Sequence, residues 1–188
     1  ALTVGYGSGG TSYSMLLHNI SVDAVEIEKK VVDASAHFSS LNHNLQENEN
    51  FKIIIDDARS YLQFSDKKYD VISTDVTGIR YYSNSNLYTK EYFELIKEKL
   101  NEGGVVSVWV LPEGISEEEQ KILMKTFYEV FPHSSVWYFY NKLTHFLVFV
   151  GSEEELRINY DDFVVRVHGE NIAKDLLEVG ITENNLLN

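Results

Sequence analysis

The sequence predicts an α/β fold with a doubly wound sheet of about seven strands, mostly parallel and closed by an antiparallel hairpin. Three observations support this fold class. Short apolar segments alternate with longer segments of helical periodicity over residues 1–130. The first apolar segment runs into a glycine turn with G-x-G-x-x-G spacing at Gly5, Gly7 and Gly10. Two β-rich segments near residue 140 are separated by about three residues, which is typical of a hairpin.

Seven segments are predicted to be strands because each is short, apolar and rich in β-branched or aromatic residues. In chain order they are residues 1–4, 23–28, 51–55, 69–75, 105–111, 135–140 and 144–150. Near-continuous apolar strands that alternate with helices form parallel sheets with helices on both faces. The final hairpin therefore makes one strand antiparallel.

Helices are predicted between these strands from periodicity and from capping residues such as Asp57, Thr89 and Ser116. Their ranges are residues 11–18, 29–42, 57–62, 89–100, 116–130 and 171–179. Residues 42–50 and 76–87 are polar and predicted to be loops. We expect one catalytic, nucleoside-binding domain over residues 1–152, and a partly ordered C-terminal appendage over residues 153–188.

The composition bounds the class of protein. The chain has 188 residues, 44% of them hydrophobic, a net charge of −13 and no cysteine. It has no apolar run of the ~18–20 residues that span a bilayer, and no disulfide or thiolate metal site can form. Binding to nucleic acid is disfavoured because its affinity comes mainly from Lys and Arg. We expect a cytoplasmic location and, because the chain opens directly on a strand, preceding sequence that has been removed.

The chemistry is expected at the carboxyl ends of the strands, where open parallel sheets bind their ligands. A glycine turn lets the ligand approach the backbone, and the helix that follows offers free N–H groups. Glu26 ends the second strand about 20 residues after Gly5, where a ribose acceptor is expected. Asp56, Asp57 and Asp75 end the next two strands. A glycine turn without ligand, and acids that end strands because loops are polar, remain the alternatives.

The order of several motifs resembles the spermidine synthase (polyamine aminopropyltransferase) family over roughly residues 2–112. The matching segments are residues 5–10, 25–28, 57–62, 69–75, 87–93 and 100–105. The resemblance implies the Rossmann-like fold of class I S-adenosylmethionine-dependent methyltransferases. Residues 109–112, 131–133 and 150–152 look more loosely like a bacterial spermidine-synthase-like branch that is often fused to membrane segments.

The resemblance also implies roles for individual residues. Glu26 matches the position that binds the ribose of decarboxylated S-adenosylmethionine, and Asp57 the position that contacts the adenine amine beside Ala58. Asp75 matches the catalytic acid, which accepts a proton from the attacking amine of putrescine. The remaining nucleoside-binding positions are Gly5, Gly7, Ser8, Gly9, Gly10 and Ile27. No metal is implied, and the His37/His43 pair is too loosely spaced for a metal site.

The chain departs from the family pattern on the amine side. Ser8 replaces the acid of the family's glycine loop, and Gly78 replaces a second acid that helps to hold the amine. The family's N-terminal β-hairpin domain is absent from this chain. Residues 79–87, with Arg80, Tyr81 and Tyr82, are expected to form a gate over the site.

The first function hypothesis is therefore a transferase that moves an aminopropyl group from decarboxylated S-adenosylmethionine to an amine. The second is a methyltransferase that uses S-adenosylmethionine on the same fold. The third is a catalytically weak ligand-binding domain of a larger, membrane-associated protein. A NAD-linked dehydrogenase fits less well because its sheet would continue parallel. The partners expected are a small amine and, through the aromatic segment 137–140, a second copy of the chain.

Overall fold

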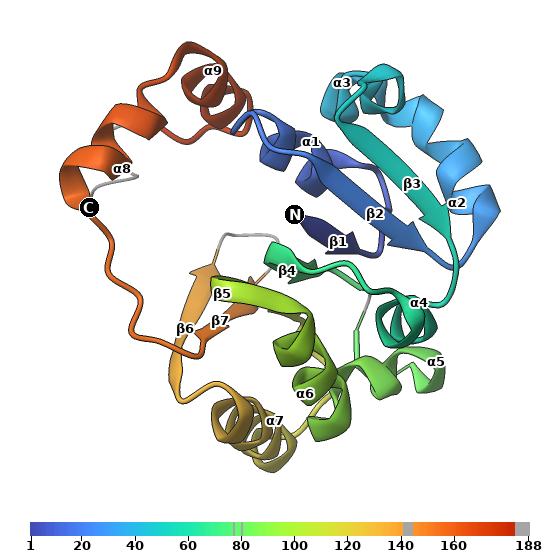
Figure 1. The fold of residues 1–188 in the computed structure, drawn as a ribbon, viewed down its shortest axis with the longest axis vertical. Helices are drawn as coiled ribbons and strands as arrows, with labels where there is room; N and C mark the ends of the chain where they lie inside the picture. The colour runs from blue at the N-terminus through green and yellow to red at the C-terminus, as the bar shows by residue number, and fades with distance from the viewer. Residues whose placement is uncertain (77, 80, 141–144, 183–188) are drawn as a thin grey trace.

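The computed structural model describes residues 1–76, 78–79, 81–140 and 145–182, and in them one mixed sheet carries helices on both faces (Figure 1). The strands are β1 Leu2–Val4, β2 Val22–Glu26, β3 Phe51–Ile55, β4 Tyr69–Thr74, β5 Leu100–Val110, β6 His133–Tyr140 and β7 His145–Ser152. Their order in the sheet is β3-β2-β1-β4-β5-β7-β6. Strands β1 to β5 pair in parallel, and β7 is antiparallel to both β5 and β6. The predicted fold class is confirmed.

The helices follow the strands in the expected alternation. The α-helices are α1 Gly10–Leu16, α2 Lys29–Ala34, α3 Ser39–Asn42, α4 Ala58–Phe64, α5 Tyr82–Ser85, α6 Lys90–Lys99, α7 Glu117–Val130, α8 Tyr160–Val167 and α9 Glu170–Glu178. Short 3₁₀ helices occupy η1 Ser35–Phe38, η2 Leu45–Glu47 and η3 Asn86–Tyr88. The predicted caps hold, because Asp57, Thr89 and Ser116 each accept a hydrogen bond from a backbone N–H in the first turn of their helix.

Two hydrophobic cores hold the helices against the sheet. The larger core joins α4, α6 and α7 to one face, where the rings of Phe93 and Phe127 meet edge to face with centroids 5.2 Å apart. The smaller core lies on the opposite face over β1–β3, where Tyr6, Ala24, Val32 and Leu45 are buried. Because both faces of β1 and β2 are covered, every residue of these two strands is buried, the polar Thr3, Asp23 and Glu26 included.

The predicted long helix over residues 29–42 is wrong, because this stretch is divided into α2, η1 and α3. Polar side chains compete there with the regular helix. The Ser35 hydroxyl donates to the Val32 carbonyl at 2.7 Å, and the Asn42 amide donates to the Ser35 carbonyl at 2.8 Å. His43 ends the stretch in the left-handed region, with φ 46°.

Other boundaries also differ from the prediction. Strand β2 ends at Glu26 because Glu28 leaves the sheet to cap α2, accepting from the Lys30 N–H at 3.0 Å. Strand β5 begins at Leu100, ahead of its predicted start, and its pairing with β4 is irregular between Tyr69 and Val71. The loop predicted over residues 76–87 contains α5 and most of η3. Helix α8 was not predicted; the Asn159 side chain caps it.

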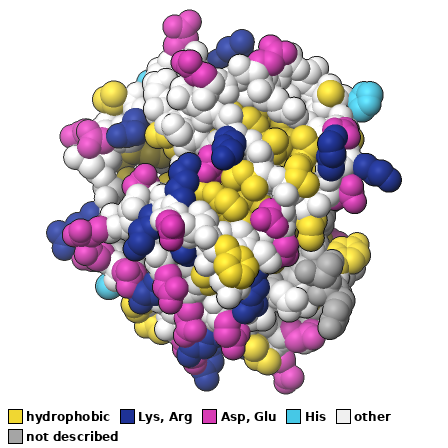
Figure 2. All heavy atoms as spheres, turned by 45° about the vertical axis from the view of Figure 1, so that its right-hand side comes forward, with side chains coloured by type: hydrophobic (Ala, Val, Ile, Leu, Met, Phe, Trp, Pro, Cys, Tyr) yellow, Lys and Arg dark blue, Asp and Glu magenta, His cyan; other side chains and the backbone are white. Residues whose placement is uncertain are grey.

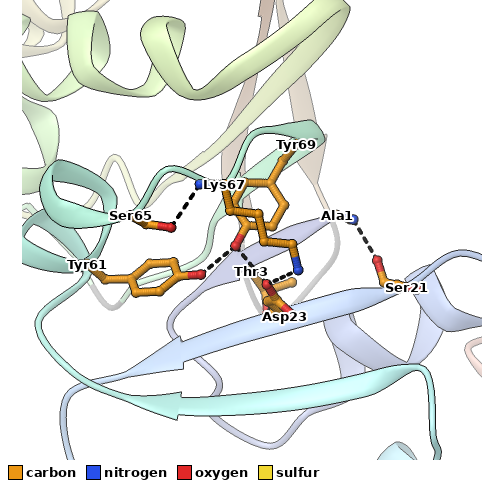
Figure 3. Close-up of polar contacts among 8 residues, drawn as sticks. All are labelled: Ala1, Thr3, Ser21, Asp23, Tyr61, Ser65, Lys67 and Tyr69. Carbon is orange, nitrogen blue, oxygen red and sulfur yellow. Dashed lines mark hydrogen bonds and ion pairs between the residues drawn. The ribbon is translucent and has the colours of Figure 1, made fainter.

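A buried polar cluster fixes the amino ends of the strands, away from the carboxyl ends where a ligand is expected (Figure 3). Asp23 in β2 is 5% exposed, and its Oδ2 accepts from Lys67 Nζ at 2.6 Å and from Tyr69 Oη at 2.7 Å. The Tyr61 and Tyr69 hydroxyls lie 2.7 Å apart. Burial and these hydrogen bonds raise the pKa of Tyr69, so this side chain stays neutral and can donate. The cluster ties β2, β4 and α4 together.

The C-terminal helices α8 and α9 stand apart from the sheet in Figure 1. Helix α9 is attached beside α1, where the Ser14 hydroxyl donates to Asp175 Oδ2 at 2.9 Å and His43 lies 3.5 Å from Glu178. The division at residue 152 stays a prediction, although β7 ends at this residue. In the described part of the chain, every helix is too short or too polar to cross a bilayer.

Candidate nucleoside-binding and catalytic site

A cavity of about 510 Å³ opens at the carboxyl ends of β1, β2 and β4. Its walls come from the glycine turn, the ends of these strands, the start of α4 and the segment that follows β4. They are formed by Val4, Gly5, Gly7, Val25, Glu26, Ile27, Val31, Asp56, Asp57, Ala58, Asp75, Val76, Asn84, Leu87 and Trp109. Figure 2 shows hydrophobic side chains gathered at the centre of the face that carries β2, β3 and α4, with charged side chains around them. The cavity thus lies at the carboxyl ends of the strands, where a doubly wound sheet is predicted to bind its ligand.

The glycine turn allows two close approaches. Gly5 has φ 85°, and a Cβ on it would lie 2.6 Å from the carbonyl oxygen of Asp75. Only glycine therefore lets the end of β1 meet the end of β4. Gly7 has φ 53° and lines the cavity, and a Cβ on it would have no heavy atom within 4 Å. The backbone at Gly7 is thus open to a ligand.

The Glu26 side chain holds the glycine turn through hydrogen bonds to the backbone. This side chain is 8% exposed, and its two oxygens accept from different backbone groups: Oε2 from the Tyr6 N–H and Oε1 from the Glu28 N–H, both at 3.0 Å. These bonds hold the carboxylate in one orientation at the cavity wall. Each oxygen has a second lone pair, so Glu26 can also accept from a diol.

Two aspartates follow β3 on the same side. Asp57 caps α4, with Oδ1 accepting from the Ser60 N–H at 2.8 Å. Asp56 Oδ1 accepts from the Asp57 N–H at 2.8 Å. Ala58 is 9% exposed and offers a small apolar surface beside them. The carboxylate oxygens can accept hydrogen bonds from the exocyclic amine of a nucleobase, and the apolar wall can pack against its ring.

Asp75 lies at the end of β4, on the other side of the glycine turn from Asp57. Its Oδ2 accepts from the hydroxyl of Thr11 in α1 at 2.8 Å. The structure gives Oδ1 no partner among the described residues. The carboxylate is exposed to the cavity, so it can accept a proton from a bound group.

The cavity brings together seven of the predicted site residues: Gly5, Gly7, Glu26, Ile27, Asp57, Ala58 and Asp75. Ser8, Gly9 and Gly10 lie outside its walls. The carbonyl of Ser8 accepts from the Asn42 amide at 2.7 Å, and Gly9 is the N-cap of α1. The binding role of these three residues stays a prediction. Arg80, expected in the gate, lies outside the described residues.

Sequence reasoning missed Trp109 and Thr11, whereas Leu87 belongs to the segment expected to form the gate and does line the cavity. The position of Trp109 near the carboxyl end of β5 was a usable signal, because β5 adjoins β4 in this strand order. Tyr88 fixes this side of the cavity: its hydroxyl has a single proton and lies 3.1 Å from the Trp109 carbonyl oxygen and 3.4 Å from the Val76 carbonyl oxygen, so the two carbonyls share one donor. Burial, followed by the nearby Tyr92 and Asp75, raises the pKa of Tyr88 and keeps it neutral. No sequence signal pairs Thr11 with Asp75, since they are far apart in the chain.

Chemically, the arrangement can hold a nucleoside along β2 and β3 and present a carboxylate at β4. The described residues contain no group of His, Asp and Glu side chains that could hold a metal ion. The fold and site define the class of protein: a doubly wound α/β domain with a ligand-sized cavity, lined by carboxylates, at the carboxyl ends of its strands.

The comparisons with known proteins agree with this class. The model of the "Spermine/spermidine synthase domain" family matches residues 1–154. A polyamine aminopropyltransferase of Saccharolobus solfataricus is 29% identical over 143 residues, which cover 74% of this chain and 48% of that protein. The chain thus spans about half the length of this curated relative. It belongs to the spermine/spermidine synthase family.

Solved structures of a spermidine synthase and of a methyltransferase-like protein share this fold. A spermidine synthase in complex with the transition-state analogue AdoDATO superposes with a TM-score of 0.73 and 19% identity, covering 95% of this chain and 69% of that one. Human methyltransferase-like protein 13 in complex with SAH gives a TM-score of 0.67 and 17% identity, covering 94% of this chain and 81% of that one. At these identities the likeness concerns the fold alone.

Proposed function

We propose that this chain is the catalytic domain of an aminopropyltransferase, which moves an aminopropyl group from decarboxylated S-adenosylmethionine to an amine acceptor. Family membership and the polyamine aminopropyltransferase relatives support this reaction. In this proposal the adenine amine donates to Asp57 and the ribose hydroxyls donate to Glu26. The glycine turn at Gly5 and Gly7 lies against the rest of the nucleoside.

The reaction is a displacement at carbon. The neutral nitrogen of the acceptor attacks the methylene carbon bonded to the sulfonium, and a nitrogen–carbon bond forms. The carbon–sulfur bond breaks, and its electron pair goes to sulfur, which leaves methylthioadenosine. The nitrogen becomes cationic and releases one proton to Asp75. A carboxylate at this place orients the amine and stabilises its developing charge.

The observation that carries the proposal is the position of Asp75. It lies in the same cavity as Glu26 and Asp57, but beyond the glycine turn, where the reacting end of the ligand would be. Thr11 holds one carboxylate oxygen, so the other can face the amine. Methyl transfer is the second candidate because the fold likeness extends to methyltransferase-like protein 13, and because the family resemblance implies a second acid where this chain has Gly78.

A thermal-shift panel with methylthioadenosine, S-adenosylhomocysteine and NADH, followed by a product assay, tests the proposal. A ligand at 100 times its Kd adds about 2.7 kcal/mol, which raises the Tm of a domain of this size by roughly 5–10 °C. We expect methylthioadenosine to give the largest shift, and formation of methylthioadenosine from decarboxylated S-adenosylmethionine in the presence of an amine. A larger shift with S-adenosylhomocysteine would favour methyl transfer, and no shift with any of the three would favour a binding domain.

The proposal includes a homodimer through β6. This edge strand carries no Asp, Glu, Lys or Arg, and Val136, Trp137 and Tyr138 are 47%, 52% and 62% exposed. The opposite edge, β3, is shorter and carries the exposed Lys52, which discourages strand pairing. On a chain with net charge −13, an uncharged edge is where a second copy can approach with least repulsion. Sedimentation of the wild type and of Trp137→Glu checks this: a dimer that the variant loses is expected, and a monomeric wild type would contradict it.

A further inference from the structure

The residues at the strand ends line the cavity in the order of the strands in the sheet. The ends of β3, β2, β1 and β4 carry, in this order, Asp57, Glu26, Gly5 and Asp75. The next strand ends are those of β5, near Trp109, and then the start of β7. If the proposed function holds, the nucleoside lies from β3 to β1 and the sulfonium lies near Asp75. The acceptor must then lie on the β5 side of Asp75.

That side presents an aromatic platform, which we define as Trp109, Phe146 and Phe139. Trp109 lies opposite Val148 in the β5–β7 pair, and Phe146 lies opposite Phe139 in the β7–β6 pair. Val148 and Phe146 are two residues apart, so the three rings share one sheet face. The Trp109 and Phe146 rings are 6.0 Å apart between centroids, and the Phe146 and Phe139 rings stack at 5.0 Å.

The platform is continuous with the reaction site. Trp109 lines the same cavity as Asp75 and Val76. The Tyr88 hydroxyl, shared between the carbonyls of Trp109 and Val76, fixes the ends of β5 and β4 relative to each other. Trp109 and Phe146 are half-buried and Phe139 is 46% exposed, so the platform offers apolar surface to a ligand.

The charges on this side disfavour a diamine. Among the described residues that line the cavity, Glu26, Asp56 and Asp57 lie at the nucleoside end, and Asp75 is the carboxylate nearest β5. Asp75 must take the proton of the attacking amine, so it cannot also neutralise a distant ammonium group. Gly78, which follows β4, is buried and adds no carboxylate to this side. A second ammonium would lose water there without gaining a carboxylate partner.

We infer that the acceptor is an amine with one reacting nitrogen and an apolar body, which packs on Trp109 and Phe146. This inference rests on the proposed function and names its acceptor class. The nitrogen faces Asp75 and the hydrocarbon part extends over the platform toward β7. The bond changes are those given above, with the carbon–sulfur electron pair going to sulfur and the amine proton to Asp75.

A fluorescence titration tests the inference with the protein's own reporter. The chain contains two tryptophans, so Trp137→Phe leaves Trp109 as the only one. This variant is saturated with methylthioadenosine and titrated with n-hexylamine or with putrescine. We expect hexylamine to change the Trp109 emission with a Kd at least about tenfold below that of putrescine, as burial of several methylene groups implies. An equal or tighter Kd for putrescine, or no binding of hexylamine, would overturn the inference.

Calorimetric titrations of two further variants test whether hexylamine binds at the aromatic platform. Trp109→Ala is expected to weaken hexylamine binding roughly tenfold without changing the Kd of methylthioadenosine. The matched control is Phe64→Ala, which removes an aromatic ring that is 82% exposed at the end of α4. This control is expected to change neither Kd. If Trp109→Ala also left the hexylamine Kd unchanged, the platform would not be the acceptor site.

The same experiments separate the two proposals. Failure of methylthioadenosine to bind would overturn the proposed function and, with it, the inference. Binding of methylthioadenosine together with a preference for putrescine would overturn the inference alone. A product assay with both amines gives a second comparison, in which turnover of hexylamine above that of putrescine is expected.

Discussion

The two sides of the cavity are built in different ways. On the proposed nucleoside side, Glu26 and Asp57 each accept from backbone N–H groups, and Gly5 brings two strand ends into contact. On the proposed acceptor side, Asp75 is held by one hydroxyl and shares the cavity wall with Trp109. Backbone bonds depend on the fold and persist when neighbouring side chains change. The nucleoside side is therefore expected to serve any reaction of this fold, whereas the acceptor side selects the substrate.

The largest effect is expected on the acceptor side, from Asp75→Asn. An amide cannot accept the proton of the attacking amine, so kcat should fall by roughly 10²–10⁴-fold. The Kd of methylthioadenosine should stay the same, because Asp75 lies beyond the nucleoside. Product formation and calorimetry measure the two quantities. Asp70→Asn, an exposed change at the start of the same strand, is the control, and retained turnover in Asp75→Asn would show that Asp75 is not the base.

The contact between the ends of β1 and β4, which joins the two sides of the cavity, is tested by Gly5→Ala. In Gly5→Ala the new Cβ would meet the Asp75 carbonyl at 2.6 Å in a left-handed conformation. We expect a loss of about 3 kcal/mol in the free energy of unfolding and weaker methylthioadenosine binding. Urea denaturation measures the stability. Gly103→Ala has a similar φ of 71° but no neighbour within 4 Å, so about 1 kcal/mol is expected there. Equal losses in both variants would mean that the contact with β4 is unimportant.

The nucleoside side is tested by Glu26→Ala. Removing the carboxylate leaves the Tyr6 and Glu28 N–H groups without their acceptor, which should cost about 2 kcal/mol in unfolding free energy. The Kd of methylthioadenosine should rise at least about tenfold, because the ribose hydroxyls lose their charged partner. In Glu28→Ala, an exposed cap is lost and this Kd should not change. An unchanged Kd in Glu26→Ala would exclude a ribose contact.

The smallest effect is expected from Thr11→Val, which removes one hydrogen bond from Asp75 and keeps the side-chain shape. Loss of about 0.5–1.5 kcal/mol should lower kcat by roughly two- to tenfold, with methylthioadenosine binding unchanged. Thr11→Ser should restore most of the rate, since it restores the hydroxyl. A Thr11→Val enzyme with full turnover would show that Asp75 needs no orienting partner.

Most of the fold follows from local pattern. The strands of β-branched residues, the glycine turn and the capping residues Asp57, Thr89 and Ser116 were each readable within a few positions. Stretches where polar side chains bond to the local backbone were not, as at Ser35 and Asn42, because such bonds compete with a helix only once the chain is folded. Helix α8 was missed because charges interrupt its apolar residues.

The candidate site was predictable where it follows the strand ends and not where it depends on contacts across the chain. Glu26, Asp57 and Asp75 end strands, so their shared location followed from the expected sheet. The Thr11–Asp75 bond and the Trp109–Phe146 contact join residues from separate elements. Their pairing depends on helix orientation and strand register, which sequence periodicity does not specify.

The attachment of α9 has a consequence for how the chain moves. This helix meets α1 through the exposed Ser14–Asp175 contact and the end of α3 through His43 and Glu178, whereas β1 and β2 lie within the core. Exposed contacts of this kind open locally at little cost, while central strands open only when the whole domain unfolds. Backbone amides of α9 should thus exchange hydrogen for deuterium far faster than those of β1. Since α1 also carries Thr11, slower exchange in α9 on ligand addition would report, from the far end of the chain, that the site is filled.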